Sequence, residues 1–316
     1  MRLLTFFLLG VAGLKTASGC EMCATYDATR SYGEPARGLF AGVAEQFTHF
    51  GTVQEDGAKV ANPSGQYLDS SISQIFAGYS LNDRLSLQLN LPVIYRSFKR
   101  PDELGGIDKG TVSGIGDASL IASYLPFYKA SGDYTLSWNL LAGVKFPTGS
   151  SDRIQEEFNE VAQPVGPLSG IHGHDLTLGT GSYDGVIGTG IYGRWKRAFA
   201  SGNLQYSIRS TGDFDYRYAN DLTWSAGPGL FLIMKEQTTV ALQFVVSGEH
   251  KGMDKFQGET AEDTGITTVF VGPQINVTLA NHLSAQVGLD LPVLIENTAL
   301  QTVVDYRIRA ALGWRF

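Results

Sequence analysis

Long segments in which apolar and polar side chains alternate constrain this sequence more than any other feature. In 282–295, leucine, valine, isoleucine or alanine occupies every second position, and mostly polar residues stand between them. The segment 304–316 repeats the pattern and places three arginines on its polar side. Successive side chains of a β-strand point to opposite faces of the sheet. Each segment therefore predicts a strand with one apolar face and one polar face.

Twelve such segments divide the chain beyond residue 37. Most of them are longer than the roughly 9–11 tilted residues that a strand needs to cross a bilayer. An even number also lets a closed antiparallel barrel return both of its ends to the same side of a membrane. The predicted strands lie near 38–50, 66–80, 84–97, 114–128, 134–147, 174–194, 198–210, 220–234, 238–249, 265–279, 283–295 and 301–316.

The connections between these segments alternate between short and long. Short ones are expected at 81–83, 129–133, 196–198, 235–237 and 280–282, and long ones near 51–66, 97–113, 148–173, 211–219 and 250–264. Aromatic residues gather at the strand ends, with Tyr79, Tyr124, Tyr192, Trp195, Trp314 and Phe316 on the short-turn side. Short periplasmic turns, long outer loops and aromatic girdles are typical of an outer-membrane barrel. We therefore predict an all-β fold, an antiparallel up-and-down transmembrane β-barrel of about twelve strands over 38–316.

Composition excludes several other classes of protein. Charged residues make up 17% of the chain, below the roughly 25% usual for soluble domains. The net charge is −7 and no lysine- or arginine-rich run occurs, which argues against a nucleic-acid partner. Two cysteines are too few for a disulfide-rich scaffold. An extracellular β-sandwich would also show alternating strands and stays open as an alternative.

The first residues have the layout of a secretory signal. Arg2 precedes an apolar run, and small residues follow at 17–19, so we expect 1–19 to be removed on export. Cys20 comes directly after the small residues, a position that suggests lipidation of this cysteine. Cys20 and Cys23 form a Cys-x-x-Cys pair within a predicted periplasmic segment, 20–37. A metal or redox site, a local disulfide and a lipidated Cys20 beside an incidental thiol all remain open.

Three glycine motifs and the last strand resemble a known family. The motifs are Gly-Ile-Gly-Asp-Ala-Ser-Leu at 114–120, Gly-Val-Lys-Phe-Pro-Thr-Gly at 143–149 and Gly-Thr-Gly-Ser-Tyr-Asp at 179–184. Together with the terminal strand 307–316 they resemble the outer-membrane proteins grouped as "MetA-pathway of phenol degradation". The resemblance spans roughly 70–316 and implies a channel or transporter linked to hydrophobic or aromatic compounds. The terminal Phe316 also resembles the signal that barrel-insertion machinery reads on outer-membrane proteins. The cysteine pair is not part of the resemblance.

The polar strand faces supply the candidate functional residues. In a barrel they line the lumen, while the apolar faces meet outer-membrane lipid. Prolines follow three of these residues closely and interrupt strand pairing near the outer end, which predicts a constriction beneath the outer rim. The alternative is that the charges pair with one another and plug the lumen. The candidates are Asn90, Asp117, Lys145, Arg209, Asp290, Asp305, Arg307 and Arg309.

Two histidine pairs invite other interpretations. His172 and His174 could bind a metal, although polar residues on an outer loop are the commoner explanation. His282 and Ser284 have the spacing used by an outer-membrane phospholipase, but the alternation places Ser284 in the lumen and His282 in a turn. We find no catalytic set and expect no cofactor. The sequence favours a passive channel or transporter over an outer-membrane enzyme or a non-conducting barrel, and it does not name the solute.

Overall fold

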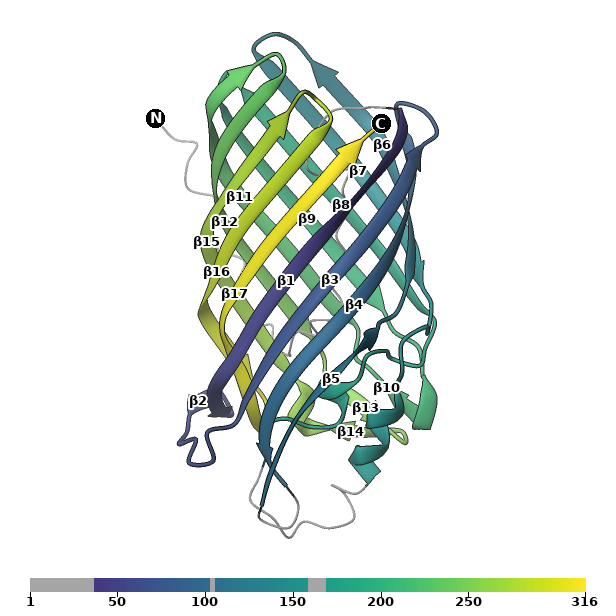
Figure 1. Cartoon of the computed structure of the whole chain (residues 1–316), viewed down its shortest axis with the longest axis vertical. Coiled ribbons are helices and arrows are strands. Elements are labelled where there is room, and N and C mark those ends of the chain that lie inside the picture. The colour runs from purple at the N-terminus through teal and green to yellow at the C-terminus, as the bar shows by residue number, and fades with distance from the viewer. Residues whose placement is uncertain (1–36, 103–105, 159–168) are drawn as a thin grey trace, which may run out of the picture.

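The strands of the computed structural model form one closed antiparallel barrel, as predicted (Figure 1). The structure describes residues 37–102, 106–158 and 169–316. The predicted signal peptide, Cys20, Cys23 and nearly all of the segment 20–37 lie outside these residues. Twelve strands build the wall: β1 (Gly38–Glu55), β3 (Tyr67–Ser80), β4 (Leu85–Pro101), β6 (Ser119–Ala130), β7 (Tyr134–Lys145), β8 (Asp184–Trp195), β9 (Ala198–Ile208), β11 (Asp221–Lys235), β12 (Thr238–Lys251), β15 (Ile266–Leu279), β16 (Leu283–Asn297) and β17 (Leu300–Arg315).

The two ends of the barrel differ as the sequence predicts. At one end, which we call the turn end, tight connections join the strands, and β1 begins where β17 stops. The other end, the loop end, carries the long connections (Figure 1). These contain the remaining elements: β2 (Ala58–Lys59), β5 (Ile107–Ile115), β10 (Tyr216–Arg217), β13 (Asp254–Phe256), β14 (Glu259–Ala261), η3 (Asp152–Gln155), η4 (His174–Leu176), η5 (Asp213–Asp215) and η6 (Glu262–Thr264). In the described part of the chain, no helix is long and apolar enough to cross a membrane.

Two predicted strands differ from the structure. The segment 114–128 is interrupted at 116–118, where β5 ends its hairpin with β4 and β6 begins to pair with β7. The segment 174–194 becomes a strand only at Asp184. The preceding residues instead pack inside the loop end, where the guanidinium of Arg96 on β4 donates a hydrogen bond to the carbonyl of Thr177.

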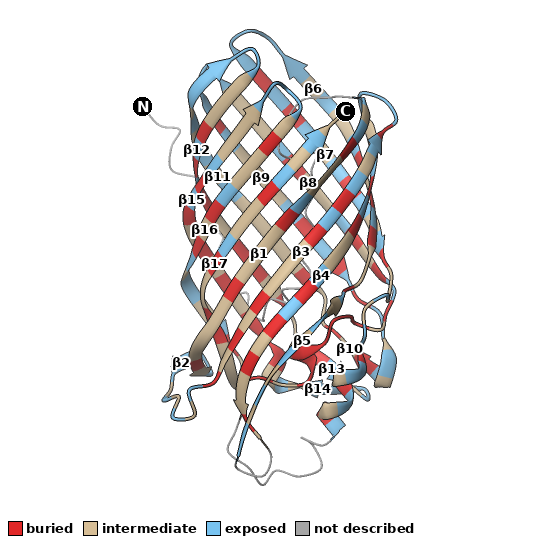
Figure 2. Cartoon of the chain, in the orientation of Figure 1, coloured by how far each residue is buried: buried red, intermediate tan, exposed pale blue. Residues whose placement is uncertain are grey.

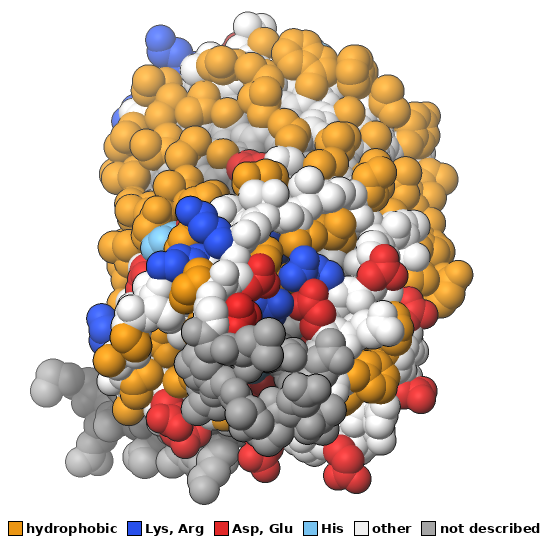
Figure 3. Space-filling model, turned by 60° about the horizontal axis from the view of Figure 1, so that its bottom comes forward, with side chains coloured by type: hydrophobic (Ala, Val, Ile, Leu, Met, Phe, Trp, Pro, Cys, Tyr) orange, Lys and Arg blue, Asp and Glu red, His pale blue; other side chains and the backbone are white. Residues whose placement is uncertain are grey.

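The two faces of the wall follow the predicted alternation. On the last two strands, the outward Val287 and Ile308 are 55% and 43% exposed, whereas the inward Asp290 and Arg307 are 2% and 6% exposed. Buried and exposed positions alternate along the wall strands in Figure 2. Hydrophobic side chains cover the outer wall in Figure 3, and charged side chains gather over the loop end. Such an apolar outer band is the surface that faces lipid.

Glu45 is an acidic side chain on the apolar outer face. Glu45 on β1 pairs in register with Ser73 on β3, and both point outward because the adjacent position Ala44 is buried in the lumen. Its carboxylate accepts hydrogen bonds from the hydroxyls of Ser71, at 2.6 Å, and Ser73. On the neighbouring β17, Trp314 and Tyr306 pair with residues four places before and after Glu45. The carboxylate therefore lies midway between two aromatic side chains of the outer face.

Two arginine substitutions on β16 test which face meets lipid. Leu289→Arg should lower the free energy of unfolding by ~2–4 kcal/mol, because it places a charge on the lipid face near the bilayer midplane. Gln286→Arg, three positions away on the lumen face, should change it little. Urea titration of both variants in lipid vesicles measures the difference. Equal losses of stability would contradict the assigned faces.

Candidate functional site in the barrel lumen

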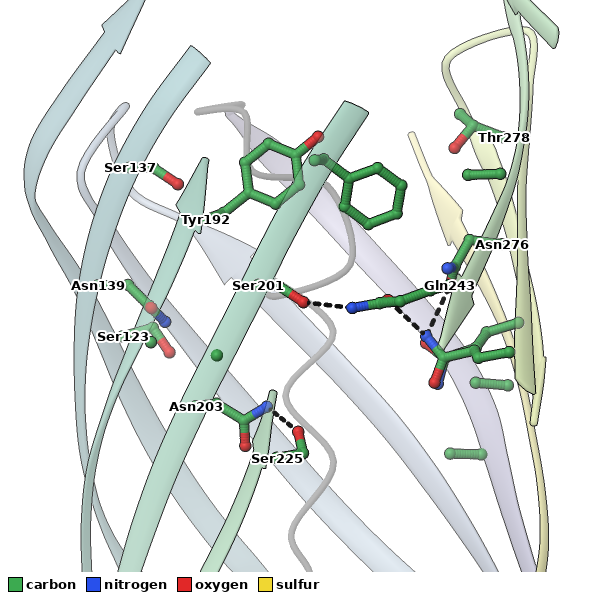
Figure 4. Close-up of a pocket in the computed structure, with 18 of the residues that line it drawn as sticks. Ser123, Ser137, Asn139, Tyr192, Ser201, Asn203, Ser225, Gln243, Asn276 and Thr278 are labelled. Carbon is green, nitrogen blue, oxygen red and sulfur yellow. Dashed lines mark hydrogen bonds between the residues drawn. The ribbon is translucent and has the colours of Figure 1, made fainter. Parts of the chain in front are cut away.

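The lumen contains a cavity of about 920 Å³ that runs inward from the turn end. Neutral polar side chains, including those labelled in Figure 4, line much of it together with apolar and charged side chains. Ser80 and Asn82 lie at its turn end, and Glu249, Asp290 and Arg307 lie deeper. The volume falls within the ~300–1,000 Å³ typical of pockets for small ligands.

The charged residues at the deep end of the cavity form ion pairs between strands. Arg309 on β17 contacts Asp290 on β16 through two hydrogen bonds of 2.6 and 2.7 Å. Arg307 donates to Glu249 on β12 at 2.9 Å, and its guanidinium lies 4.4 Å from the centre of the Phe270 ring. The prediction that Arg307, Arg309 and Asp290 project into the lumen agrees with these positions. Each arginine is paired, as the alternative interpretation of the lumen charges required.

A second series of buried charged side chains extends over successive strands on the inside of the wall, nearer the loop end. We call Asp117, Lys145, Asp184, Arg209 and Asp221 the ion-pair belt. Lys145 Nζ lies 2.5 Å from Asp117 and 2.9 Å from Asp184. Arg209 lies 2.7 Å from Asp184 and 2.9 Å from Asp221. All five side chains are at most 8% exposed. Three of the predicted lumen residues therefore belong to one network, which links the ends of β6, β7, β8, β9 and β11.

The ion-pair belt holds an inward-folded part of the long loop. Asp117 accepts hydrogen bonds from the backbone nitrogen and the hydroxyl of Thr180, both at 2.9 Å. Gly149 N donates to the other oxygen of Asp117 at 3.0 Å. A Cβ atom at Gly179 would lie 2.5 Å from both Asp117 Oδ1 and the Gly149 carbonyl oxygen. The glycines of the second and third motifs thus permit the two segments to approach this aspartate closely.

Apolar packing seals the same segment against the wall. Ile171 and Leu176 are 1% and 0% exposed and pack against Leu68 on β3 and Phe98 on β4. The sequence does not predict this contact, because 148–173 is expected to be an outer loop and 174–183 to be strand. The available signal was the pair of apolar residues flanking the histidines, at 171 and 176.

Asn90 lies in the lumen, as predicted, within a group of hydrogen-bonded amides. It is 1% exposed, and its side-chain oxygen accepts hydrogen bonds from Gln74 at 3.0 Å and Gln88 at 2.5 Å. Its amide nitrogen donates to Ser119 at 3.1 Å. This arrangement ties β3, β4 and β6 together on the inner wall.

Asp305 contradicts the predicted lumen position. A register shift between β1 and β17 leaves it at a bulge, with His49 opposite Tyr306 and Phe50 opposite Val304. Its carboxylate accepts a hydrogen bond from Thr52 at 2.7 Å and lies 3.8 Å from His49 on the outer face. A bulge turns the extra residue away from the strict alternation, which is why the sequence pattern misplaced this residue.

The histidines of the outer loop lie in a buried polar cluster. The rings of His172 and His174 stack with centres 5.6 Å apart. His174 Nδ1 lies 2.9 Å from Glu157, and His172 Nε2 lies 3.4 Å from Asp263. Tyr216 stacks on the other side of His174. Within the described residues, no group of three or more potential ligands is arranged to hold a metal ion.

Burial and charge set the protonation of this cluster. Burial alone would raise the pKa of Glu157, but the neighbouring His174 lowers that pKa to about 2. Burial opposes protonation of His174, yet the carboxylates of Asp175, Glu157 and Asp263 raise its pKa well above the ordinary 6.5. The two groups therefore form an imidazolium–carboxylate pair at neutral pH.

The phospholipase-like pair does not form a catalytic arrangement. His282 Nδ1 donates to the backbone carbonyl of Arg315 at 2.8 Å, and its ring stacks on Trp314 at the turn end. Ser284 is 8% exposed, and its hydroxyl donates to the carbonyl of Gly313. A nucleophilic serine needs a base within hydrogen-bond reach, and each side chain here is bonded to backbone instead.

Removing the lysine of the ion-pair belt should destabilise the barrel. Lys145→Met leaves Asp117 and Asp184 without their shared cation, and breaking a buried ion pair costs ~3–5 kcal/mol. We expect the urea midpoint of the folded barrel to fall accordingly. The matched control is Lys235→Met at the exposed turn end, which should leave the midpoint unchanged. Similar midpoints for both variants would show that the belt does not stabilise the fold.

The His174–Glu157 pair should make stability depend on pH. Because the folded pKa of His174 is raised, its contribution is complete below about pH 6.5 and is lost as pH rises through the folded pKa. Because the pKa of Glu157 is lowered to about 2, its contribution is complete above 4.5 and is lost as pH falls toward 2. The unfolding free energies of the unmodified protein and of His174→Gln should therefore differ most between these limits. A difference that stays constant on alkalinisation would contradict the assignment.

The fold is shared with an outer-membrane channel of known structure. The sequence matches no family model and no curated protein. The COG4313 outer membrane channel from Pseudomonas putida F1 is 17% identical with a TM-score of 0.61, and the match covers 93% of this chain and 100% of that one. The β domain of the Bordetella autotransporter BrkA (11% identity, 89% and 100% covered, TM-score 0.44) and the translocator domain of NalP from Neisseria meningitidis (13%, 89% and 89%, TM-score 0.41) match less well. The chain thus has a closed antiparallel β-barrel fold of the kind found in outer-membrane proteins.

Proposed function

We propose that this protein is a selective channel for passive passage of small molecules across the outer membrane. The observation that carries the proposal is the cavity of about 920 Å³, lined by polar side chains inside a wall that is apolar outside. Lipid cannot satisfy polar groups, so a polar interior of this size serves a hydrated or polar solute. The fold likeness to the channel from Pseudomonas putida supports the same role.

The loop end argues for selectivity rather than for a wide, water-filled pore. The segment around Leu176 and Thr180 packs inside the barrel and is held by Arg96 and Lys145. A solute entering from this side must pass these contacts. A barrel closed permanently by them is the non-conducting alternative, and conductance measurements separate the two. The side chains that an enzyme would need at 282 and 284 are bonded to backbone.

We further propose how the chain reaches its membrane. Residues 1–19 would direct export and be removed, and Cys20 would become the first residue, open to lipidation. Short turns on the periplasmic side and long loops outside are usual for these barrels, which places both ends of the barrel in the periplasm. The terminal strand ending in Phe316, 67% exposed, would be the segment that insertion machinery recognises.

Ion selectivity in planar bilayers tests the channel. Neutralising the arginines in Arg307→Gln plus Arg309→Gln leaves the carboxylates of Glu249 and Asp290 to act on passing ions. The reversal potential across a salt gradient should therefore shift toward cation selectivity, since lumen charges tune selectivity.

The matched control neutralises the acidic residue of each ion pair instead of the arginine. Glu249→Gln plus Asp290→Asn leaves both arginines and should shift the reversal potential toward anions. Heat-modifiable migration on gels confirms that each variant is folded. Folded protein that never conducts would refute the channel, and unchanged reversal potentials in both double variants would remove these pairs from the pathway.

A further inference from the structure

Two neighbouring rows of side chains stand out on the inner wall near the turn end. In the first row, Ser137 on β7, Tyr192 on β8 and Ser201 on β9 lie side by side in register. Tyr192 is therefore a lumen residue rather than part of the aromatic girdle that the sequence suggested (Figure 4). Same-face rows of a sheet are separated by two residues, roughly 7 Å along the strand. An aromatic ring flanked by two hydroxyls thus faces the cavity.

The second row presents amides in place of the ring. Asn139 on β7, Gly190 on β8 and Asn203 on β9 are in register, and Ser225 on β11 pairs with Asn203. Asn203 donates a hydrogen bond to the Ser225 hydroxyl at 2.5 Å. A Cβ atom at Gly190 would collide with Asn139 Oδ1. The glycine therefore leaves room for the amide of Asn139, which lies over Gly190 on the same inner face as Asn203.

The aromatic side of the cavity extends beyond Tyr192. Its ring centre lies 5.8 Å from that of Phe199, which lies 5.0 Å from that of Phe231. Phe199 lies against Gly229, where a side chain would collide with the ring. Three rings on β8, β9 and β11 thus form a continuous apolar surface beside the polar rows.

Polar groups continue along the cavity wall on the strands that follow β11. Gln243 on β12 donates to Ser201 at 2.7 Å, and Gln274 on β15 donates to Asn276 at 2.9 Å. Amides and hydroxyls can each donate and accept hydrogen bonds. The arginines at the deep end are neutralised by Glu249 and Asp290, so the lining offers many hydrogen bonds and little net charge from these pairs.

We propose that these two rows bind a neutral, polyhydroxylated solute such as a mono- or disaccharide. The apolar C–H face of the sugar ring would lie on Tyr192 and Phe199, and its hydroxyls would exchange hydrogen bonds with Asn139, Asn203 and the neighbouring serines. A simple aromatic compound, by contrast, fills the ring surface but offers few hydrogen bonds in place of the water that it displaces from these amides, and lost hydrogen bonds to buried polar groups are costly. This binding site specifies the solute class of the proposed channel. It rests on the channel function only for the route by which the sugar reaches the lumen.

Binding of maltose to the full-length protein in detergent, measured by titration calorimetry, tests this site without requiring conduction. We expect maltose to bind, and gluconate and phenol, which represent ionised and aromatic solutes, to bind more weakly. The double variant Asn139→Leu plus Asn203→Leu keeps side-chain size and should weaken maltose binding about tenfold or more through lost hydrogen bonds. Tyr192→Leu, on a different strand, should weaken it independently. Thr189→Ala on the outer face, where Thr189 accepts from Trp138, is the control and should have no effect.

The outcomes separate this proposal from the channel function. Maltose binding that falls in both lumen variants supports the site even if the protein fails to conduct, a failure that would refute only the channel. Phenol binding tighter than maltose, no maltose binding, or equal maltose affinity in the folded double variant and the unmodified protein would each overturn the site.

Discussion

Closure of the sheet between β1 and β17 is the constraint on which the rest of the structure depends. Lipid offers no hydrogen bonds to an open strand edge, so the first and last strands must pair along their length. They do so from Phe40 opposite Arg315 to Glu55 opposite Leu300. Pairing over that length fixes which residues face inward. The single irregular stretch, around Phe50, is where Asp305 leaves the lumen and joins His49 and Thr52 on the outer face.

Closure also creates an interior in which each charge needs a partner. A buried, unpaired charge costs several kcal/mol, and the lumen meets this constraint in two layers. Near the loop end, Lys145 and Arg209 alternate with three aspartates along the ion-pair belt. Deeper in the cavity, Arg307 and Arg309 have one carboxylate each. Between these layers and the turn end the lining is mainly neutral, and this separation gives the cavity its distinct chemical character.

The sequence predicted the strands far better than it predicted the loops. Alternation identifies a strand from local information, so the number of strands, the tight turns and most lumen residues could be read directly. The start of β8 could not, because residues before Asp184 are held by distant partners such as Arg96 and Lys145. For the same reason the partnership of His174 with Glu157, far along a loop, left no local pattern.

The paired rows at Tyr192 and Asn139 were also missed, for a different reason. Each strand contributes only one or two residues to these rows, and in the sequence those residues look like any other lumen-facing residues. Their meaning depends on the register between β7, β8 and β9, which brings Gly190 between two asparagines and Tyr192 between two serines. A sequence gives the face of each residue but not its neighbours across strands.

The same dependence on register explains the polar residues of the outer wall. Ser71 and Ser73 break the apolar alternation of β3, and Glu45 breaks that of β1, so each looks like an isolated fault in its own strand. In the folded sheet the two serine hydroxyls donate to the one carboxylate. Polar groups in lipid are costly unless they are satisfied within the protein. The three departures therefore form a single hydrogen-bonded unit, in which the two serines supply the donors that the carboxylate needs, and either serine replaced alone would leave that carboxylate facing lipid with a donor missing.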